Sequence, residues 1–506
     1  MDVSARPGDE LCFMPATELA GRIRARDVSP VEAVQAFFER IEACDVGLNA
    51  YTTLLHDEAQ TKARDAERRS KSGHELGPLH GVPVAIKDLE PKAGVRNTWG
   101  SKALADYVAS EDSVHVQRLE EAGAIVLGTT NVPEFGHKGC TDNYLFGPTS
   151  SPFARGHNAG GSSGGSAAAV GAALCALAQG SDGGGSIRIP ASLSGVYGIK
   201  PSRGRVPFAP RPDAFGPQKP FVQVGPLTRT VEDAALMLTV IAGPHERDPT
   251  CIPGEVDWLS AARGSIAGLR VAYSPDLGVF PVDGRVSSVV GDAVHAFEAA
   301  GADVDTPAFT LGRPHSELIG AWIRWSSVFY AAMISTFEEQ EGIDLVASRD
   351  DVTPSFLTYV DLAPSVTGVA YRLDDIIRTE VFDAFQDLFE DYDLLVTPTV
   401  AAPPPANSAT RGHTLGPTEI GGEAIEPMIG WCMTYPMNFS GHPAASVPAG
   451  FTEDGLPIGL QIVGRQFRDD MVLAASAAFE RARPWHDAYA TRLDLTFAGA
   501  AGQASR

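Results

Sequence analysis

The sequence predicts an α/β protein built around a mixed, largely buried sheet. Short apolar segments of strand length alternate along the chain with segments of helical period, which is typical of strands joined by covering helices. Of the 506 residues, 44% are hydrophobic and 20% are charged, which is enough apolar surface for a sizeable core. The sequence contains no internal repeat, so we expect one domain rather than a repeat array.

The individual elements follow from local signals. Residues 15–45 have helical spacing of apolar side chains, and Ser29-Pro30-Val31-Glu32 is a helix-start pattern within them. The run GVPVAIKD, residues 81–88, is expected to form a short buried strand that ends in two charges. Further elements are predicted as helices over 62–72, 113–121 and 286–300, as strands over 124–128, 269–273 and 394–397, and as long loops over 207–220 and 401–406.

Charge and cysteine content narrow the choice of partner and compartment. With 40 basic and 63 acidic residues the net charge is −23, so we expect neither nucleic acid nor a membrane as partner. Residues 1–15 lack the features of a secretory signal, and the most apolar run, 167–178, is too short to span a bilayer. The six cysteines form no CxxC pair, which favours free thiols in the cytoplasm. The sequence does not encode the oligomeric state, and a homodimer stays open.

Two glycine- and serine-rich segments, GGSSGGS at 160–166 and GSDGGGSIRIP at 180–190, are the most informative about function. Buried helix and strand patterns flank them, which disfavours a flexible linker. A phosphate-binding P-loop needs Lys and then Ser or Thr after its last glycine, and alanines follow Ser166 instead. A nucleophile elbow is formally matched at Ser162 and Ser163, but the polar segment 151–158 before them is interpreted as a loop, whereas the elbow needs a strand.

A third interpretation explains the second segment by its backbone. Gly183, Gly184, Gly185 and Ser186 offer consecutive N–H groups with little side-chain bulk. Such a run can form a nest of donors around a developing oxyanion, an oxyanion hole. A serine that closes the nest is well placed to attack the same carbonyl carbon. Removing one donor of this kind typically costs about 10²–10³ in rate.

Several blocks follow one another along the chain: TNVPEF at 130–135, GGSSGGS at 160–166, GSDGGGSIRIPAS at 180–192, GIKP at 198–201, GPLTRTVED at 225–233, and the segments 438–450 and 455–461. They resemble the amidase signature family, and the resemblance covers most of the chain, roughly residues 10–485. The resemblance implies one large domain with a mixed, mostly parallel twisted sheet covered by helices on both faces. It also implies chemistry with no metal and no organic cofactor.

The resemblance also divides the chain into regions. Residues 1–75 are expected to form an N-terminal helical segment packed on the core, and residues 76–490 the amidase signature domain. A variable substrate-pocket region is expected within it at about 305–430. The small, polar residues of 491–506 are expected to fray.

The family's catalytic group is a nucleophilic serine, a second serine preceded by a cis peptide bond, and a lysine base. Carried over by motif, these roles fall on Ser186, Ser162 and Lys87, with separations of 186 − 162 = 24 and 162 − 87 = 75 residues. A free lysine amine has a pKa of about 10.4, and burial at a strand end lowers it. Adjacent Asp88 is expected to point to the other face of the strand.

Three further residues are expected to support this group. Ser163 is expected to do so through a hydrogen bond. Asp182 and Arg188 are expected to hold the nest by pairing with the backbone or with each other. At Gly183 many family members have Thr or Ile, so we expect the extra room to alter which acyl groups fit.

Substrate choice is poorly encoded in the sequence. Trp322 and Trp325 share one face of a predicted helix and could line a pocket, although core packing also explains them; Tyr144 and Phe146 are similar candidates. The form of the second glycine-rich segment resembles that of stand-alone bacterial members acting on aryl amides, nylon-type oligomers or carbamates. We therefore expect hydrophobic amides, anilides or urethanes as small-molecule substrates, with esters as side substrates. The alternative is the glutaminase subunit of a tRNA-dependent amidotransferase.

Overall fold

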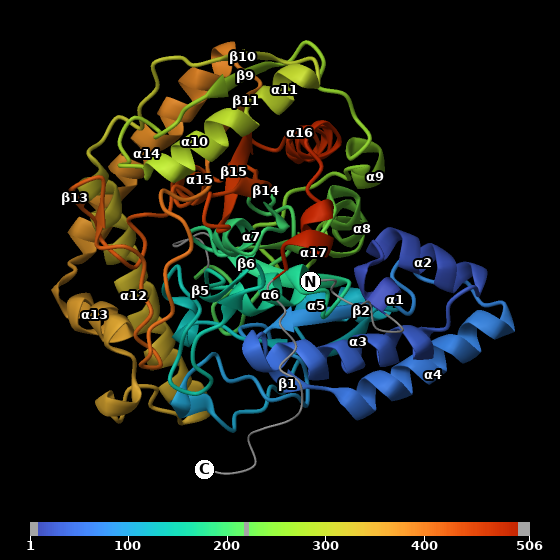
Figure 1. Ribbon diagram of the computed structural model, residues 1–506. Helices are drawn as coiled ribbons and strands as arrows, with labels where there is room; N and C mark the ends of the chain where they lie inside the picture. The colour runs from blue at the N-terminus through green and yellow to red at the C-terminus, as the bar shows by residue number, and fades with distance from the viewer. Residues whose placement is uncertain (1–8, 217–221, 494–506) are drawn as a thin grey trace.

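The computed structural model describes residues 9–216 and 222–493 (Figure 1). Within these ranges the main sheet has eleven strands. In spatial order they are β1 (Tyr51–Leu54), β3 (Ile125–Thr130), β2 (Pro83–Lys87), β6 (Leu177–Asp182), β8 (Gln223–Thr228), β7 (Tyr197–Lys200), β14 (Ala444–Phe451), β15 (Pro457–Gly464), β11 (Leu394–Pro398), β9 (Arg270–Tyr273) and β10 (Asp303–Asp305).

The sheet is mixed, as predicted, and its parallel pairs lie in its two flanks. On one flank β2 runs parallel to β3 and β6, and on the other β9 runs parallel to β11 and β10. The pairs from β6 through β8, β7, β14 and β15 to β11 are antiparallel. The short connection between β14 and β15 can only join antiparallel neighbours, whereas β2 and β3 are joined through a helix.

The helices come from segments throughout the chain. In chain order they are α1 (Asp9–Phe13), α2 (Ala16–Ala25), α3 (Pro30–Cys44), α4 (His56–Ser72), α5 (Val114–Glu121), α6 (Gly164–Gly171), α7 (Arg188–Leu193), α8 (Val231–Ile241), α9 (Trp258–Ala261), α10 (Gly284–Ala293), α11 (His295–Ala299), α12 (His315–Glu341), α13 (Pro354–Leu362), α14 (Gly368–Asp391), α15 (Pro436–Ser440), α16 (Asp469–Ala482) and α17 (Asp487–Thr491).

Helices cover both faces of the sheet, as predicted. A Cβ atom added at Gly459 of β15 would lie 2.6 Å from Ser192 of α7, and one at Gly464 would lie 2.6 Å from Val472 of α16. Residues five apart in a strand point to opposite faces. The helices α7 and α16 therefore sandwich the same strand.

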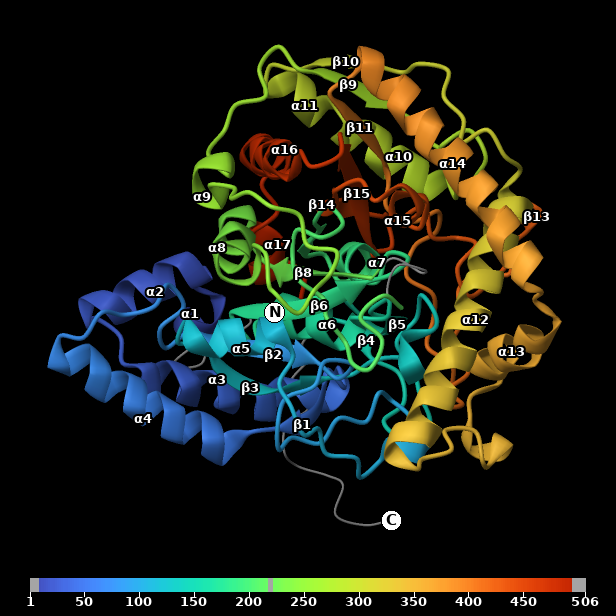
Figure 2. The same ribbon diagram turned by 180° about the vertical axis from the view of Figure 1, so that it is seen from behind.

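Two groups of helices flank this sandwich. Figures 1 and 2 show α12, α13 and α14 standing together along one side of the molecule, with α2, α3 and α4 on the opposite side. Trp322 and Trp325 of α12, Phe385 of α14 and Phe439 of α15 belong to one buried apolar cluster. This cluster anchors the outer helices to the part of the sheet where the glycine-rich loops lie.

Three local predictions need correction. The helical pattern over 15–45 is two helices, because the chain takes a left-handed turn at Arg26 (φ 68°) and restarts at the Ser29 N-cap, whose Oγ accepts from Val31 N. The pattern over 286–300 is likewise divided between α10 and α11. The polar segment expected to be a loop contains β5 (Ala154–Asn158), which pairs with β4 (Ser150–Ser151) in a small separate sheet.

The predicted C-terminal tail and one predicted loop lie partly outside the described residues. Of the tail predicted over 491–506, residues 494–506 lie outside the described residues, as do 217–221 near the end of the predicted loop 207–220. Within the described ranges, none of the helices combines the length and the apolar character needed to cross a membrane. The remaining described strands are β12 (Glu419–Ile420) and β13 (Glu423–Ala424), which pair with each other.

Candidate active site

Lys87 lies at the end of β2, enclosed between the two parallel neighbours of that strand. Its side chain is fully buried. The Nζ atom is 2.7 Å from Ser162 Oγ and donates to the backbone oxygen and the Oγ atom of Ser181 at 3.2 and 3.1 Å. The expected contact between the lysine and Ser162 is thus present in the structure.

The surroundings of Lys87 favour its neutral form. Burial lowers the pKa of its amine from 10.5 to about 7, while the charges of Glu90 and Asp182 act in the opposite direction. Glu90 is itself buried, and its Oε2 atom is 3.0 Å from His115 Nε2. Asp88 turns away from the lysine: its carboxylate accepts from Thr98 Oγ1 at 2.5 Å. A lysine with a pKa near 7 can take up a proton at neutral pH.

Ser162 is held in the first glycine-rich loop, and the Gly161–Ser162 peptide bond is cis. The next residue, Ser163, donates its backbone N–H to the backbone oxygen of Ser186 at 3.1 Å and its hydroxyl to the backbone oxygen of Ser181 at 3.3 Å. These bonds tie the first loop to the second. They place the backbone of Ser186 against the residue that follows Ser162, although the two serines are 24 residues apart (186 − 162 = 24).

The second loop is shaped by the carboxylate at its start. Asp182 closes β6, and its Oδ1 atom accepts the backbone N–H of Gly185 at 2.8 Å. Gly185 therefore departs from the sequence expectation: its N–H is directed at Asp182, which leaves Gly183, Gly184 and Ser186 as candidate oxyanion donors. Within residues 9–216 and 222–493, the N–H groups of these three residues have no hydrogen-bond acceptor. Ser186 is partly exposed.

The surroundings of the three glycines restrict a larger side chain to different degrees. Gly185 has φ 125°, and a Cβ atom there would lie 1.9 Å from Thr434 Oγ1. A Cβ atom at Gly184 would lie 2.6 Å from Cη2 of Trp322. At Gly183 the nearest atom would be 3.4 Å away, on Val222, which is ordinary contact. Among the described residues, no atom therefore crowds a Cβ atom at Gly183, in contrast to Gly184 and Gly185.

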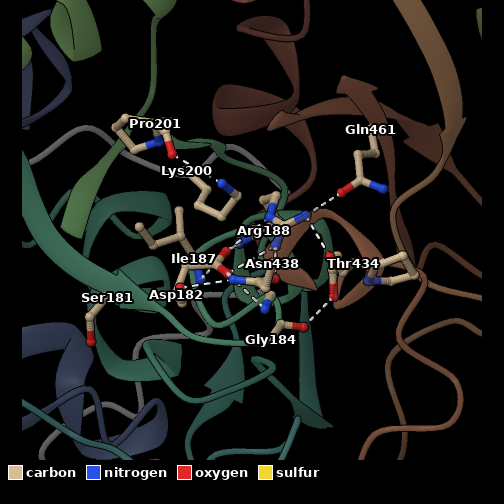
Figure 3. A network of polar contacts seen from close by, with 12 residues as sticks. Ser181, Asp182, Gly184, Ile187, Arg188, Lys200, Pro201, Thr434, Asn438 and Gln461 are labelled. Carbon is tan, nitrogen blue, oxygen red and sulfur yellow. Dashed lines mark hydrogen bonds and ion pairs between the residues drawn. The ribbon is translucent and has the colours of Figure 1, made fainter. Parts of the chain in front are cut away.

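Asp182 and Arg188 form the centre of a buried polar network (Figure 3). Arg188 Nε donates to Asp182 Oδ2 and its Nη2 donates to Oδ1, both at 2.9 Å. Although burial raises the pKa of Asp182, the charge and hydrogen bonds of Arg188 lower it to about 2, with help from Lys200 and Asn438. The pair is therefore ionised at neutral pH and holds the loop rather than exchanging protons.

The network reaches residues that the sequence analysis did not single out. Asn438 Nδ2 donates to the backbone oxygen and to Oδ1 of Asp182, and Thr434 Oγ1 donates to the backbone oxygen of Gly184 at 2.6 Å. Ser181 and Glu90, beside Lys87, were also missed. No local pattern marks Thr434 or Asn438, because each is about 250 residues from its partner.

The four candidate pocket residues lie in different places. Trp322 packs against Gly184, beside the candidate oxyanion donors. Trp325 is fully buried, with its ring 4.8 Å from that of Phe439. Tyr144 lies under Lys102 Nζ, which is 5.2 Å from its ring, and the guanidinium of Arg96 is 5.6 Å from the ring of Phe146. Of the four, only Trp322 is seen to touch the glycine-rich loop. For the part of the chain that the structure describes, no group of three His, Cys, Asp or Glu side chains is arranged to hold a metal ion.

Comparisons with known proteins agree with the sequence resemblance. The chain is 40% identical to an acylamidase of Rhodococcus erythropolis, covering 94% of this chain and 97% of that protein. It is 36% identical to a glutamyl-tRNA(Gln) amidotransferase subunit of Moorella thermoacetica, covering 94% of this chain and 98% of that protein.

Solved structures show the same likeness. A bacterial aryl acylamidase of the amidase signature family superposes with a TM-score of 0.91 at 41% identity, covering 95% of this chain and 99% of that one. The 6-aminohexanoate cyclic dimer hydrolase complexed with substrate superposes with a TM-score of 0.85 at 32% identity, covering 96% and 99%. The Amidase family profile matches residues 32–473. The chain therefore belongs to the amidase family and is a hydrolase of amide C–N bonds.

Proposed function

We propose that the chain hydrolyses small carboxylic amides through an acyl-enzyme formed on Ser186. The observation that carries the proposal is the 2.7 Å contact between Lys87 Nζ and Ser162 Oγ in a fully buried setting. A serine hydroxyl is a weak nucleophile at neutral pH and needs a base within hydrogen-bond reach. A lysine whose pKa is about 7 is such a base.

The proton path in this proposal runs through one intervening hydroxyl. Lys87 Nζ accepts the proton of Ser162 while Ser162 accepts the proton of Ser186, and Ser186 Oγ bonds to the carbonyl carbon. Ser162 then passes this proton to the leaving nitrogen and takes back the proton held by Lys87, so the lysine is neutral again. The C–N bond breaks and the amine is released. Water attacks the resulting ester along the same path, which releases the acid and restores the Ser186 hydroxyl.

The candidate donors of the second loop stabilise the charge that forms in both steps. The N–H groups of Gly183, Gly184 and Ser186 have no acceptor among the described residues. A preorganised set of donors stabilises an oxyanion without having to reorient during the reaction. Asp182 and Arg188 hold the loop in this shape.

The substrate class is inferred from the loop surroundings and from the relatives. The indole of Trp322 against Gly184 supports an apolar or aryl group next to the reacting carbonyl. Similarity to an acylamidase and to a 6-aminohexanoate cyclic dimer hydrolase supports anilides and hydrophobic amides. Carbamates and esters present the same carbonyl geometry and are proposed as further substrates.

The experiment is a hydrolysis screen with the purified chain over p-nitroacetanilide, primary amides, carbamates and esters, combined with fluorophosphonate labelling. We expect anilide hydrolysis and one labelled peptide, at Ser186. Ser186→Ala should lose both, and Lys87→Met should lose most activity. Lys138→Met is the matched control, because this second buried lysine donates instead to the backbone oxygen of Gly412. Labelling that persists in Ser186→Ala would assign the nucleophile elsewhere.

A second candidate is the glutaminase subunit of a tRNA-dependent amidotransferase. Similarity to the Moorella subunit over nearly the whole of both chains favours it. Such a subunit works within an assembly, so it should hydrolyse glutamine only when its partner subunits are added. Anilide hydrolysis by the chain alone would reject this candidate.

The cellular compartment and the class of substrate are proposed from the cysteines and the net charge of the chain. All six cysteines carry free thiols, which supports a reducing compartment and hence the cytoplasm. The net charge of −23 supports a small-molecule substrate rather than nucleic acid. The homodimer is tested by sedimentation, in which a species of 53.4 kDa would be the monomer.

A further inference from the structure

A pocket of about 560 Å³ lies between α14, the end of α15 and the segment after β7. Its lining includes none of Lys87, Ser162 and Ser186. The volume is within the range of pockets that hold small organic molecules. The proposed function does not use this pocket.

Three guanidinium groups line it, from Arg203, Arg372 and Arg378, with the single carboxylate of Asp375. Arg372 Nη1 is 2.9 Å from Asp375 Oδ2, and Arg378 Nε donates to the backbone oxygen of Phe439 at 2.7 Å. The lining thus has two more positive than negative side chains, in a protein whose net charge is −23. Burial and the charge of Arg203 lower the pKa of Arg378 to about 10, although Asp375 acts in the opposite direction.

The lining also includes apolar and neutral polar residues. Phe382 and Ile252 are among those that provide apolar surface, while Thr250, Thr379 and Ser440 provide hydroxyl groups. Guanidinium groups bind carboxylates and phosphates in a bidentate manner. Because apolar walls stand beside the cations, an anion with a hydrocarbon body matches the pocket better than a bare inorganic ion does.

We propose that this pocket binds a small organic carboxylate, with its charged group among Arg203, Arg372 and Arg378 and its apolar body against Phe382 and Ile252. The ligand lies next to α15, the helix that carries Asn438 to Asp182. Binding does not depend on hydrolysis, so the proposal stands or falls separately from the proposed function.

The test is calorimetric titration of the full chain with benzoate, benzyl alcohol and inorganic phosphate. We expect benzoate to bind, benzyl alcohol to bind at least about tenfold more weakly for lack of charge, and phosphate to bind more weakly than benzoate. Equal binding of benzyl alcohol, or binding of phosphate alone, would overturn the organic carboxylate as ligand.

Two variants locate the benzoate. Arg372→Ala should weaken binding about tenfold or more. Arg68→Ala, which also removes an exposed arginine paired with an aspartate three residues away, should leave it unchanged. Thr379→Trp, at an exposed position of α14, should block the pocket without removing a charge. Thermal melts check that each variant is folded. Benzoate affinity that is the same in Arg372→Ala and Thr379→Trp as in the parent would place the ligand elsewhere and refute the proposal.

Discussion

Arg188 donates to both carboxylate oxygens of Asp182, from Nε to Oδ2 and from Nη2 to Oδ1. Neither side chain is exposed to solvent. The same guanidinium donates to Gln461 Oε1 at 2.6 Å and to Asn438 Oδ1 at 2.7 Å. One side chain from α7 thereby connects the loop after β6 with β15 and α15. The shape of the candidate oxyanion hole depends on this buried ion pair.

Breaking the pair is expected to be costly. Arg188→Met leaves the charge of Asp182 buried without its partner, which typically costs about 3–5 kcal/mol. The free energy of unfolding, measured by urea denaturation, should fall by about this amount. Arg68→Ala, which removes an exposed partner of Asp65, should change it by less than about 0.5 kcal/mol. Equal stability of the two variants would show that the buried network does not hold the fold.

The pH dependence of activity follows from the pKa of Lys87. The proposed base works only when neutral, and burial lowers its pKa to about 7. As pH rises through this value the neutral fraction grows, so kcat/KM for p-nitroacetanilide should rise and then level off. A profile that falls between about pH 6 and 8 would contradict a lysine base.

Glu90 is expected to set the position of that pH profile. Its backbone N–H donates to the backbone oxygen of Lys87 at 2.9 Å, and its charge raises the pKa of the lysine. Glu90→Gln removes the charge, so the acid limb of the kcat/KM profile should move to lower pH. Glu120→Gln is the control, because that carboxylate pairs with Lys62 and Lys92 instead. An acid limb that stays in place in Glu90→Gln would mean that its charge does not reach the lysine.

Adjacent glycines provide a matched pair of substitutions. Gly184→Ala puts a methyl group 2.6 Å from the ring of Trp322, whereas Gly183→Ala meets only an ordinary contact at 3.4 Å. We expect kcat for an acetanilide to fall at least about tenfold in Gly184→Ala, because the loop must shift. Gly183→Ala should keep acetanilide hydrolysis and lose activity on bulkier acyl groups. Similar activity losses in both variants would remove the distinction between the two positions.

Most of the candidate site could be predicted from the sequence because its parts lie in short motifs. Lys87 ends a run of strand character, and Asp182, Ser186 and Arg188 lie within seven residues of one another. The sequence could not distinguish three consecutive glycines, however. Only neighbours from elsewhere in the chain, Thr434 and Trp322, make Gly185 and Gly184 differ from Gly183.

The fold class was predictable from the alternation of strands and helices, whereas some boundaries were not. Ser29-Pro30 marks where α3 begins, but α2 ends at Arg26, which adopts a left-handed conformation without the glycine that usually marks such a helix end. The strand β5 contains charged and polar residues, since it pairs in a small separate sheet rather than in the buried one. In both places the environment overrides the local pattern.

The full burial of Lys87 makes the activity of this enzyme sensitive to the packing of the side chains around it. Burial keeps a neutral fraction of the amine at neutral pH, because it lowers the pKa that the nearby carboxylates raise. A cavity opened among the apolar side chains around β2 would admit water and restore an ordinary ammonium group. Such a change would inactivate the enzyme at neutral pH although every reacting atom is still in place. Activity would return in alkaline buffer.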